Sequence, residues 1–183
     1  MEAFLTSTWL VALAEMGDRT QFLALILAAR FKQPMSIIAG IFCATLANHF
    51  LSGLLGFFGG SLMSPDVKRW TVGLLFIGFA VWTIIPDKES PLSRATEFGA
   101  FAATLFSFFL VELGDKTQIA TVTLAARFHA VVPVVIGTTF GLLAANIPIV
   151  FFGHKLTDRL PLRTIRAIAA VFFLVAGLLT ILS

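Results

Sequence analysis

Apolar residues fill most of this 183-residue chain, in long stretches separated by short polar segments. A helix needs about 20 apolar residues to cross a bilayer, and several stretches reach or approach that length. The predicted membrane-spanning helices are 4–29, 35–59, 68–85, 98–126, 131–153 and 164–182. The segment 86–91, which begins and ends with proline, opens the longest polar connection. The pattern predicts an all-α integral membrane protein with six transmembrane helices.

Composition supports this prediction. The chain is 58% hydrophobic and 13% charged, whereas a soluble domain carries about 25% charged residues. No basic patch with interleaved aromatic residues is present, so the expected partner is membrane lipid and not nucleic acid. Glu2 occupies the place of a basic signal-peptide region, so we expect the first apolar segment to be retained. No cofactor is expected.

The sequence repeats itself at an offset of 97 residues. Segment 15–31 matches segment 112–128 at 10 of 17 positions, and both begin with one motif, EMGDRTQ or ELGDKTQ. Each half contains three predicted spans, and an odd number means that the second half enters the membrane from the opposite side. The sequence therefore predicts a 3+3 inverted-topology repeat: residues 1–86, a cytoplasmic connecting loop at 87–97, and residues 98–183.

The distribution of basic residues predicts the orientation, because cytoplasmic loops are enriched in Lys and Arg. Eight flank the loops on one side: Arg30, Lys32, Lys88, Arg94, Lys155, Arg159, Arg163 and Arg166. Three flank the loops on the other side: Lys68, Arg69 and Arg127. The first group is therefore expected in the cytoplasm, with both termini outside it.

Four acids lie near the middle of the first and fourth spans: Glu15, Asp18, Glu112 and Asp115. A charged residue at this depth costs about 2.5–3.5 kcal/mol, so these side chains must face an interior or a water-filled cavity. On a continuous helix Glu15 and Asp18 share a face, and so do Glu112 and Asp115. We expect the two helices to bring all four carboxylates to one metal site.

Carboxylates held together repel one another, so they either share protons or bind a cation. Two bases accompany the acids, and a regular helix pairs Arg19 with Glu15 and Lys116 with Glu112. Four acids and two bases leave a charge of −2, which one divalent cation would neutralise. Oxygen ligands favour a hard ion such as Ca²⁺, Mg²⁺ or Mn²⁺.

Further polar residues are candidates for the transport pathway or for support of the ligands: Arg19, Lys116, Thr20, Thr117, Gln21, Gln118, Asn48, His49 and Asn146. Thr20 and Thr117 reach the site only if the motif glycines break the helix. The glutamines and asparagines either line the pathway or form interhelical hydrogen bonds. His49, if it lined the cavity, would favour Mn²⁺ over Ca²⁺ through its nitrogen ligand.

The pattern E-x-G-D-[KR]-[TS], present twice, resembles that of a family of manganese and calcium transporters. This family includes bacterial manganese exporters and Golgi manganese/calcium–proton exchangers. The matching residues are Glu15, Gly17, Asp18, Arg19 and Thr20, then Glu112, Gly114, Asp115, Lys116 and Thr117. The resemblance implies a secondary-active exporter of divalent cations in exchange for protons, whose motif acids bind the metal. It selects Mn²⁺ out of the cytoplasm, with a Ca²⁺/H⁺ exchanger of the same fold as the alternative.

The chain lacks a long N-terminal targeting region and an extended central acidic loop, which suits a bacterial inner-membrane member. Three other readings stay open. An intramembrane aspartyl protease would use Asp18 and Asp115, but it would need none of the duplicated glutamates and bases. A passive channel would not need an inverted repeat. A structural ion-pair cluster would need fewer acids. We therefore expect a transporter and not an enzyme.

Overall fold

The structure, a computed structural model, describes residues 1–84, 99–156 and 162–182. Within these ranges the chain forms eight helices and no strand. They are α1 (Glu2–Glu15), α2 (Arg19–Phe31), α3 (Pro34–Ser61), α4 (Pro65–Ile84), α5 (Ala100–Glu112), α6 (Lys116–Phe128), α7 (Val131–Leu156) and α8 (Leu162–Leu182). The connecting loop predicted at 87–97 lies outside the described residues.

Two of the six predicted helices are broken in the middle. The stretch 4–29 is divided into α1 and α2, and the stretch 98–126 into α5 and α6. A continuous helix through each motif is therefore wrong, and the reason is the conformation of the motif glycines described below. The other four segments are continuous helices, as expected, because α3, α4, α7 and α8 begin and end within three residues of the expected limits.

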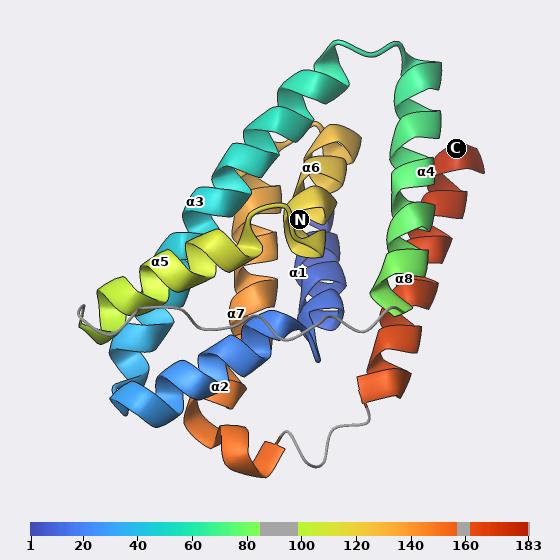
Figure 1. Cartoon of the computed structure of the whole chain (residues 1–183). Helices are drawn as coiled ribbons and strands as arrows, with labels where there is room; N and C mark the ends of the chain where they lie inside the picture. The colour runs from blue at the N-terminus through green and yellow to red at the C-terminus, as the bar shows by residue number, and fades with distance from the viewer. Residues whose placement is uncertain (85–98, 157–161, 183) are drawn as a thin grey trace.

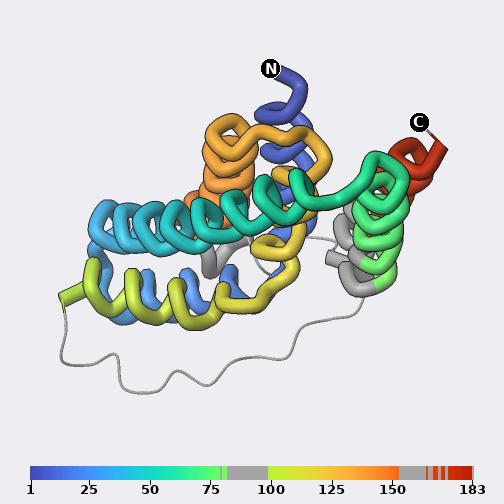
Figure 2. The backbone as a smooth tube through the Cα atoms, turned by 90° about the horizontal axis from the view of Figure 1, so that it is seen from above, coloured from blue at the N-terminus to red at the C-terminus, as the bar shows by residue number. Residues whose placement is uncertain are grey.

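The two halves have the same order of elements and run in opposite directions. In Figure 1, α3 rises and α7 descends, while α4 descends and α8 rises. The halves also interlock, because α1 packs against α7 and α3 packs against α5 and α6. Figure 2 shows α2 and α5 running side by side along α3. This arrangement brings the breaks in both halves close together.

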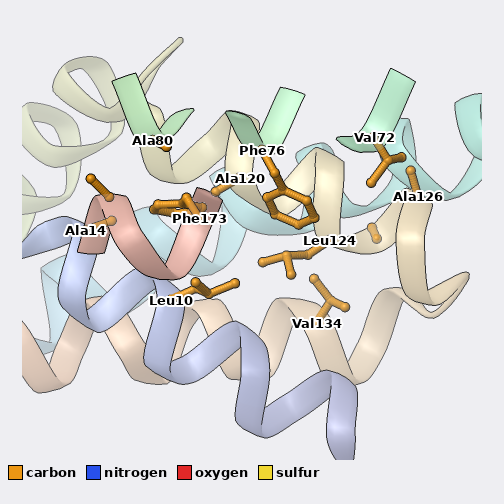
Figure 3. Packing of buried hydrophobic residues seen from close by; sticks show 12 residues of the cluster. Leu10, Ala14, Val72, Phe76, Ala80, Ala120, Leu124, Ala126, Val134 and Phe173 are labelled. Carbon is orange, nitrogen blue, oxygen red and sulfur yellow. The ribbon is translucent and has the colours of Figure 1, made fainter. Parts of the chain in front are cut away.

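Two apolar clusters hold these helices together. In the first, Phe76 of α4 and Phe173 of α8 have ring centroids 6.2 Å apart and pack with Leu10 and Leu124 of α1 and α6 (Figure 3). The second joins α2, α3, α5 and α7, and includes Leu27, Ile41, Phe108 and Leu142. The two clusters fix α1 and α5, which end at the motifs.

The outer surface is apolar, as expected for a protein in contact with lipid. Within the described residues, α3 and the part of α7 up to Phe152 are long and apolar enough to cross a membrane. Large side chains point outward on several helices, among them Leu55, Phe106, Leu110 and Val171. A soluble protein rarely exposes so many together.

Small residues allow α3 to approach its neighbours closely, and Gly56 is the tightest case. A Cβ atom at Gly56 would overlap the backbone carbonyl of Val122 in α6, whereas a Cβ at Gly59 would meet nothing within 4 Å. Overpacking of this kind costs about 1–3 kcal/mol. We therefore expect Gly56→Ala to lower the apparent melting temperature in detergent by roughly 4–8 °C.

Gly59→Ala, in the same helix, is the matched control and should leave the melting temperature within about 2 °C of the parent value. Equal melting temperatures for the two variants would show that α3 and α6 do not pack as closely as described.

Candidate functional site

The first motif forms a tight turn between α1 and α2. Met16 has φ −66° and ψ 119°, and Gly17 has φ 80°. The Asp18 N–H donates to the Glu15 carbonyl at 3.1 Å. These values describe a type II β-turn, in which the third residue needs a positive φ and is therefore usually glycine. Asp18 then becomes the N-terminal cap residue of α2.

The second motif repeats this geometry between α5 and α6. Leu113 has φ −60° and ψ 116°, Gly114 has φ 74°, and the Asp115 N–H donates to the Glu112 carbonyl at 3.0 Å. The glutamate therefore ends one helix and the aspartate begins the next. Each turn thus places the end of one helix beside the start of the next, and paired helix ends of this kind are favourable surroundings for ions.

The two bases pair across the repeats. Arg19 Nη2 lies 3.0 Å from Asp115 Oδ1 and also donates to the Val111 carbonyl at 2.8 Å. Lys116 Nζ lies 3.7 Å from Asp18 Oδ1. The expected pairing of each base with the glutamate of its own motif is wrong. The helix break removes the i,i+4 relation on which that expectation depended.

Three motif acids converge. One carboxylate oxygen from each of Glu15, Asp18 and Asp115 lies within 4.8 Å of the others. All three side chains are buried, at 0%, 3% and 2% exposure. Burial of three carboxylates beside two bases leaves an excess of negative charge that a cation would offset. Glu112 is equally buried but does not join this group of three.

Glu112 is held by the long helix of the other half. Its carboxylate accepts a hydrogen bond from Thr45 Oγ1 at 2.9 Å and a long one from Asn48 Nδ2 at 3.4 Å. Both partners come from α3. Sequence reasoning missed Thr45, although it lies three residues before Asn48 and therefore on the same helix face.

Glu15 has the equivalent surroundings in the opposite half. Asn146 Nδ2 of α7 donates to Glu15 Oε1 at 3.2 Å, and Thr20 Oγ1 donates to the same oxygen. In the described part of the chain, the Oδ1 atoms of Asn48 and Asn146 are buried without a hydrogen-bond partner. These amide oxygens are therefore available as further oxygen ligands.

The motif glutamines form hydrogen bonds with the backbone of the turns. Gln21 Oε1 accepts from the Gly17 N–H at 2.8 Å, and Gln118 Oε1 accepts from the Gly114 N–H at 2.6 Å. Gln21 Nε2 also donates to the Ala145 carbonyl of α7 at 2.9 Å. Of the two roles that the sequence left open, these contacts match interhelical and local hydrogen bonding. A cavity of about 130 Å³ between α1 and α7 also borders Gln21.

The remaining candidates are Thr20, Thr117 and His49, and they differ in their contacts. The break brings Thr20 to Glu15, as the conditional prediction required. Thr117 lies against Asp115, with its N–H and Oγ1 at 3.5 Å and 3.4 Å from Oδ2. His49 is fully buried, and neither ring nitrogen has a hydrogen-bond partner among the described residues. It does not belong to the three-acid group.

Comparison with known proteins decides the family. The family model described as "Divalent cation/proton antiporter GDT1" matches residues 3–91 and 100–183. The chain belongs to the GDT1 family. The match confirms the resemblance to cation transporters that the two motifs indicated. The family is one of transporters and not of enzymes. Membership also supports the prediction of an integral membrane protein.

Relatives of this GDT1 family member span bacteria and plants. A Vibrio cholerae protein named "Putative manganese exporter" is 44% identical over 181 residues, which cover 98% of this chain and 90% of the relative. GDT1-like protein 5 of Arabidopsis thaliana is 24% identical over 225 residues, covering 100% and 96%. GDT1-like protein 3 of Oryza sativa subsp. japonica is 28% identical over 201 residues, covering 94% and 71%. No solved structure matches the chain.

Proposed function

We propose that this protein exports Mn²⁺ from the cytoplasm in exchange for protons. The observation that carries the proposal is the convergence of Glu15, Asp18 and Asp115 from both repeats within 4.8 Å. Family membership supports divalent cation transport, and the name of the Vibrio relative supports manganese.

The ligands proposed for the cation are Glu15, Asp18, Asp115 and Glu112. The first three form the group described above. Glu112 is hydrogen-bonded to Thr45 of α3, and it would reach the cation only when the two halves move relative to each other. The free amide oxygens of Asn48 and Asn146 complete an all-oxygen set. Such a set suits Mn²⁺ and Ca²⁺ alike, so a Ca²⁺/H⁺ exchanger remains the second candidate.

The proposed topology is a 3+3 inverted repeat with a fixed site between the halves. Residues 1–86 and 98–183 are the two repeats, joined by a cytoplasmic loop at 87–97, in a bacterial inner membrane with both termini outside the cytoplasm. The opposite directions of α3 and α7, and of α4 and α8, support this arrangement. Each broken pair, α1–α2 or α5–α6, then counts as one membrane passage.

Exchange follows from competition at the carboxylates. A cation arriving from the cytoplasm displaces protons from them, and protons arriving from outside displace the cation. When no cation is bound, Arg19 and Lys116 reduce the repulsion among the carboxylates by pairing with Asp115 and Asp18. Because each base pairs with the opposite repeat, metal binding weakens the ion pairs that hold the halves together. Rocking of one half against the other then moves access from one side to the other.

Inverted membrane vesicles test the exchange directly. With an acidic interior we expect Mn²⁺ uptake, and Mn²⁺ addition should release interior protons, because the two ions occupy the same carboxylates. Uptake of Mn²⁺ and the interior pH are measured together, with and without an uncoupler that collapses the gradient. Vesicles lacking the protein provide the background.

Each result of this assay bears on the proposal. Undiminished Mn²⁺ uptake after collapse of the gradient, without any pH change, would exclude proton exchange. Uptake of Ca²⁺ in preference to Mn²⁺ would select the second candidate. A requirement for sodium in place of the pH gradient would change the coupling ion.

A further inference from the structure

Away from the motifs, three bases surround one cavity. Its volume is about 430 Å³, and its lining includes Lys68 and Arg69 of α4 and Arg127 of α6. One acid, Asp66, also lines it, paired with Arg69 at 3.3 Å while its side chain stays 84% exposed. The cavity therefore keeps an excess of positive charge. A bound anion would neutralise this excess charge.

The backbone around this cavity also favours an anion. Lys68 and Arg69 lie close to the start of α4, where the helix dipole disfavours cations. Arg127 is fixed from the side of α8, because its Nη1 donates to the Ala176 carbonyl at 3.1 Å and to Thr180 Oγ1. A bound anion offsets the repulsion among the bases and lies at the positive end of the α4 dipole.

A second cavity adjoins the first at Arg127. It measures about 580 Å³ and runs between α1 and α8. Its walls are mostly apolar and include Leu5, Trp9, Val175, Leu179 and Phe128. Glu2 is the acid that borders this second cavity. A cationic cavity and an apolar groove thus share one arginine.

We propose that the two cavities bind one anionic phospholipid, with its phosphate among Lys68, Arg69 and Arg127 and an acyl chain along the groove between α1 and α8. The helix termini around the site agree with the depth of a lipid headgroup. α1 and α4 begin there, and α6 and α8 end there. Free phosphate would leave the groove unused, and a neutral zwitterionic lipid would leave the bases uncompensated.

Such a lipid bridges parts of both repeats. The phosphate would contact α4 of the first half and α6 of the second, and the acyl chain would lie on α1 and α8. The site is independent of the proposed metal centre and shares no residue with it. The lipid composition of the membrane is therefore expected to change how strongly α4 and α8 pack against α1 and α6.

Trp9 provides a direct test, because it lines the groove and is 64% exposed. In a chain carrying Trp70→Phe and Trp82→Phe, Trp9 is the single tryptophan. Phosphatidylglycerol with brominated acyl chains, added to the protein in detergent, should quench its fluorescence at lower concentrations than brominated phosphatidylcholine. One basic residue near an anionic headgroup is worth about fivefold in affinity.

The double variant Lys68→Gln/Arg69→Gln should therefore weaken phosphatidylglycerol binding by roughly 10- to 30-fold and leave phosphatidylcholine unaffected. Arg30→Gln/Lys32→Gln removes the same charge at the end of α2 and is the matched control, expected to retain the preference. Unbrominated phosphatidylglycerol should reverse the quenching, and inorganic phosphate should not.

The proposal fails if both lipids quench equally, or if the Lys68/Arg69 variant keeps the preference for phosphatidylglycerol. Displacement by inorganic phosphate at the same concentration would also overturn it, since the site would then recognise phosphate without an acyl chain. Leu179→Trp, read by native mass spectrometry, fills the groove and should lower retained phosphatidylglycerol. Unchanged retention in that variant would contradict a role for the groove.

Discussion

Asp18→Asn is expected to abolish Mn²⁺ uptake into inverted vesicles, to below about 1% of the parent rate, since loss of even a supporting metal contact costs 10- to 100-fold. Asp18 is a member of the three-carboxylate group and the partner of Lys116, which is buried at 4% exposure. Its neutralisation therefore removes a ligand and breaks a buried ion pair. The second effect alone destabilises a protein by about 3–5 kcal/mol.

A double variant separates these two effects. Asp18→Asn/Lys116→Gln removes both members of the pair, so stability should recover, measured as the melting temperature in detergent. Transport should not recover, because the ligand is still missing. If the acids serve only as structural ion pairs, the double variant should regain both stability and Mn²⁺ uptake.

The symmetry of the site supplies the matched experiment. Asp115→Asn/Arg19→Gln removes the other cross-repeat pair, which is closer at 3.0 Å and has a more exposed base. We expect the same pattern of restored stability and absent transport. Normal transport in either double variant would exclude a shared metal site built from both motifs.

The location of the acids is predictable from the sequence, but their partners are not. The offset of 97 residues and the depth of Glu15 and Glu112 in apolar stretches are sufficient to predict that the two motifs meet. The partner of each base depends on a helical wheel drawn through the motif. That wheel assumes a continuous helix, and the break turns Arg19 and Lys116 toward the opposite repeat.

The break itself is readable in the motif. Glu-x-Gly-Asp combines glycine at the third position of a type II turn with an N-terminal cap residue for a following helix. Hydrophobicity alone hides this signal, because both flanking segments are apolar. Thr45 carries no comparable signal, since a threonine within an apolar helix commonly bonds to its own backbone. Its contact with Glu112 depends on how α3 packs on α5.

Gly114→Ala is expected to reduce Mn²⁺ uptake by about 5- to 30-fold, because a positive φ costs a non-glycine residue roughly 1–2 kcal/mol. Gly114 has φ 74°, and a Cβ placed there meets nothing within 4 Å. The effect therefore arises from the backbone and not from a clash. Relaxation of the turn would move Glu112 and Asp115 together, since both belong to it.

A substitution series identifies the cause. Gly114→Asn should retain more transport than Gly114→Ala, and Gly114→Val should retain least, because asparagine tolerates a left-handed backbone and β-branched residues do not. Gly78→Ala is the control, since its Cβ also meets nothing within 4 Å but its φ is not positive, and it should transport normally. Equal rates for the Asn, Ala and Val variants would show that transport does not depend on the turn, and the carboxylates would then need another means of convergence.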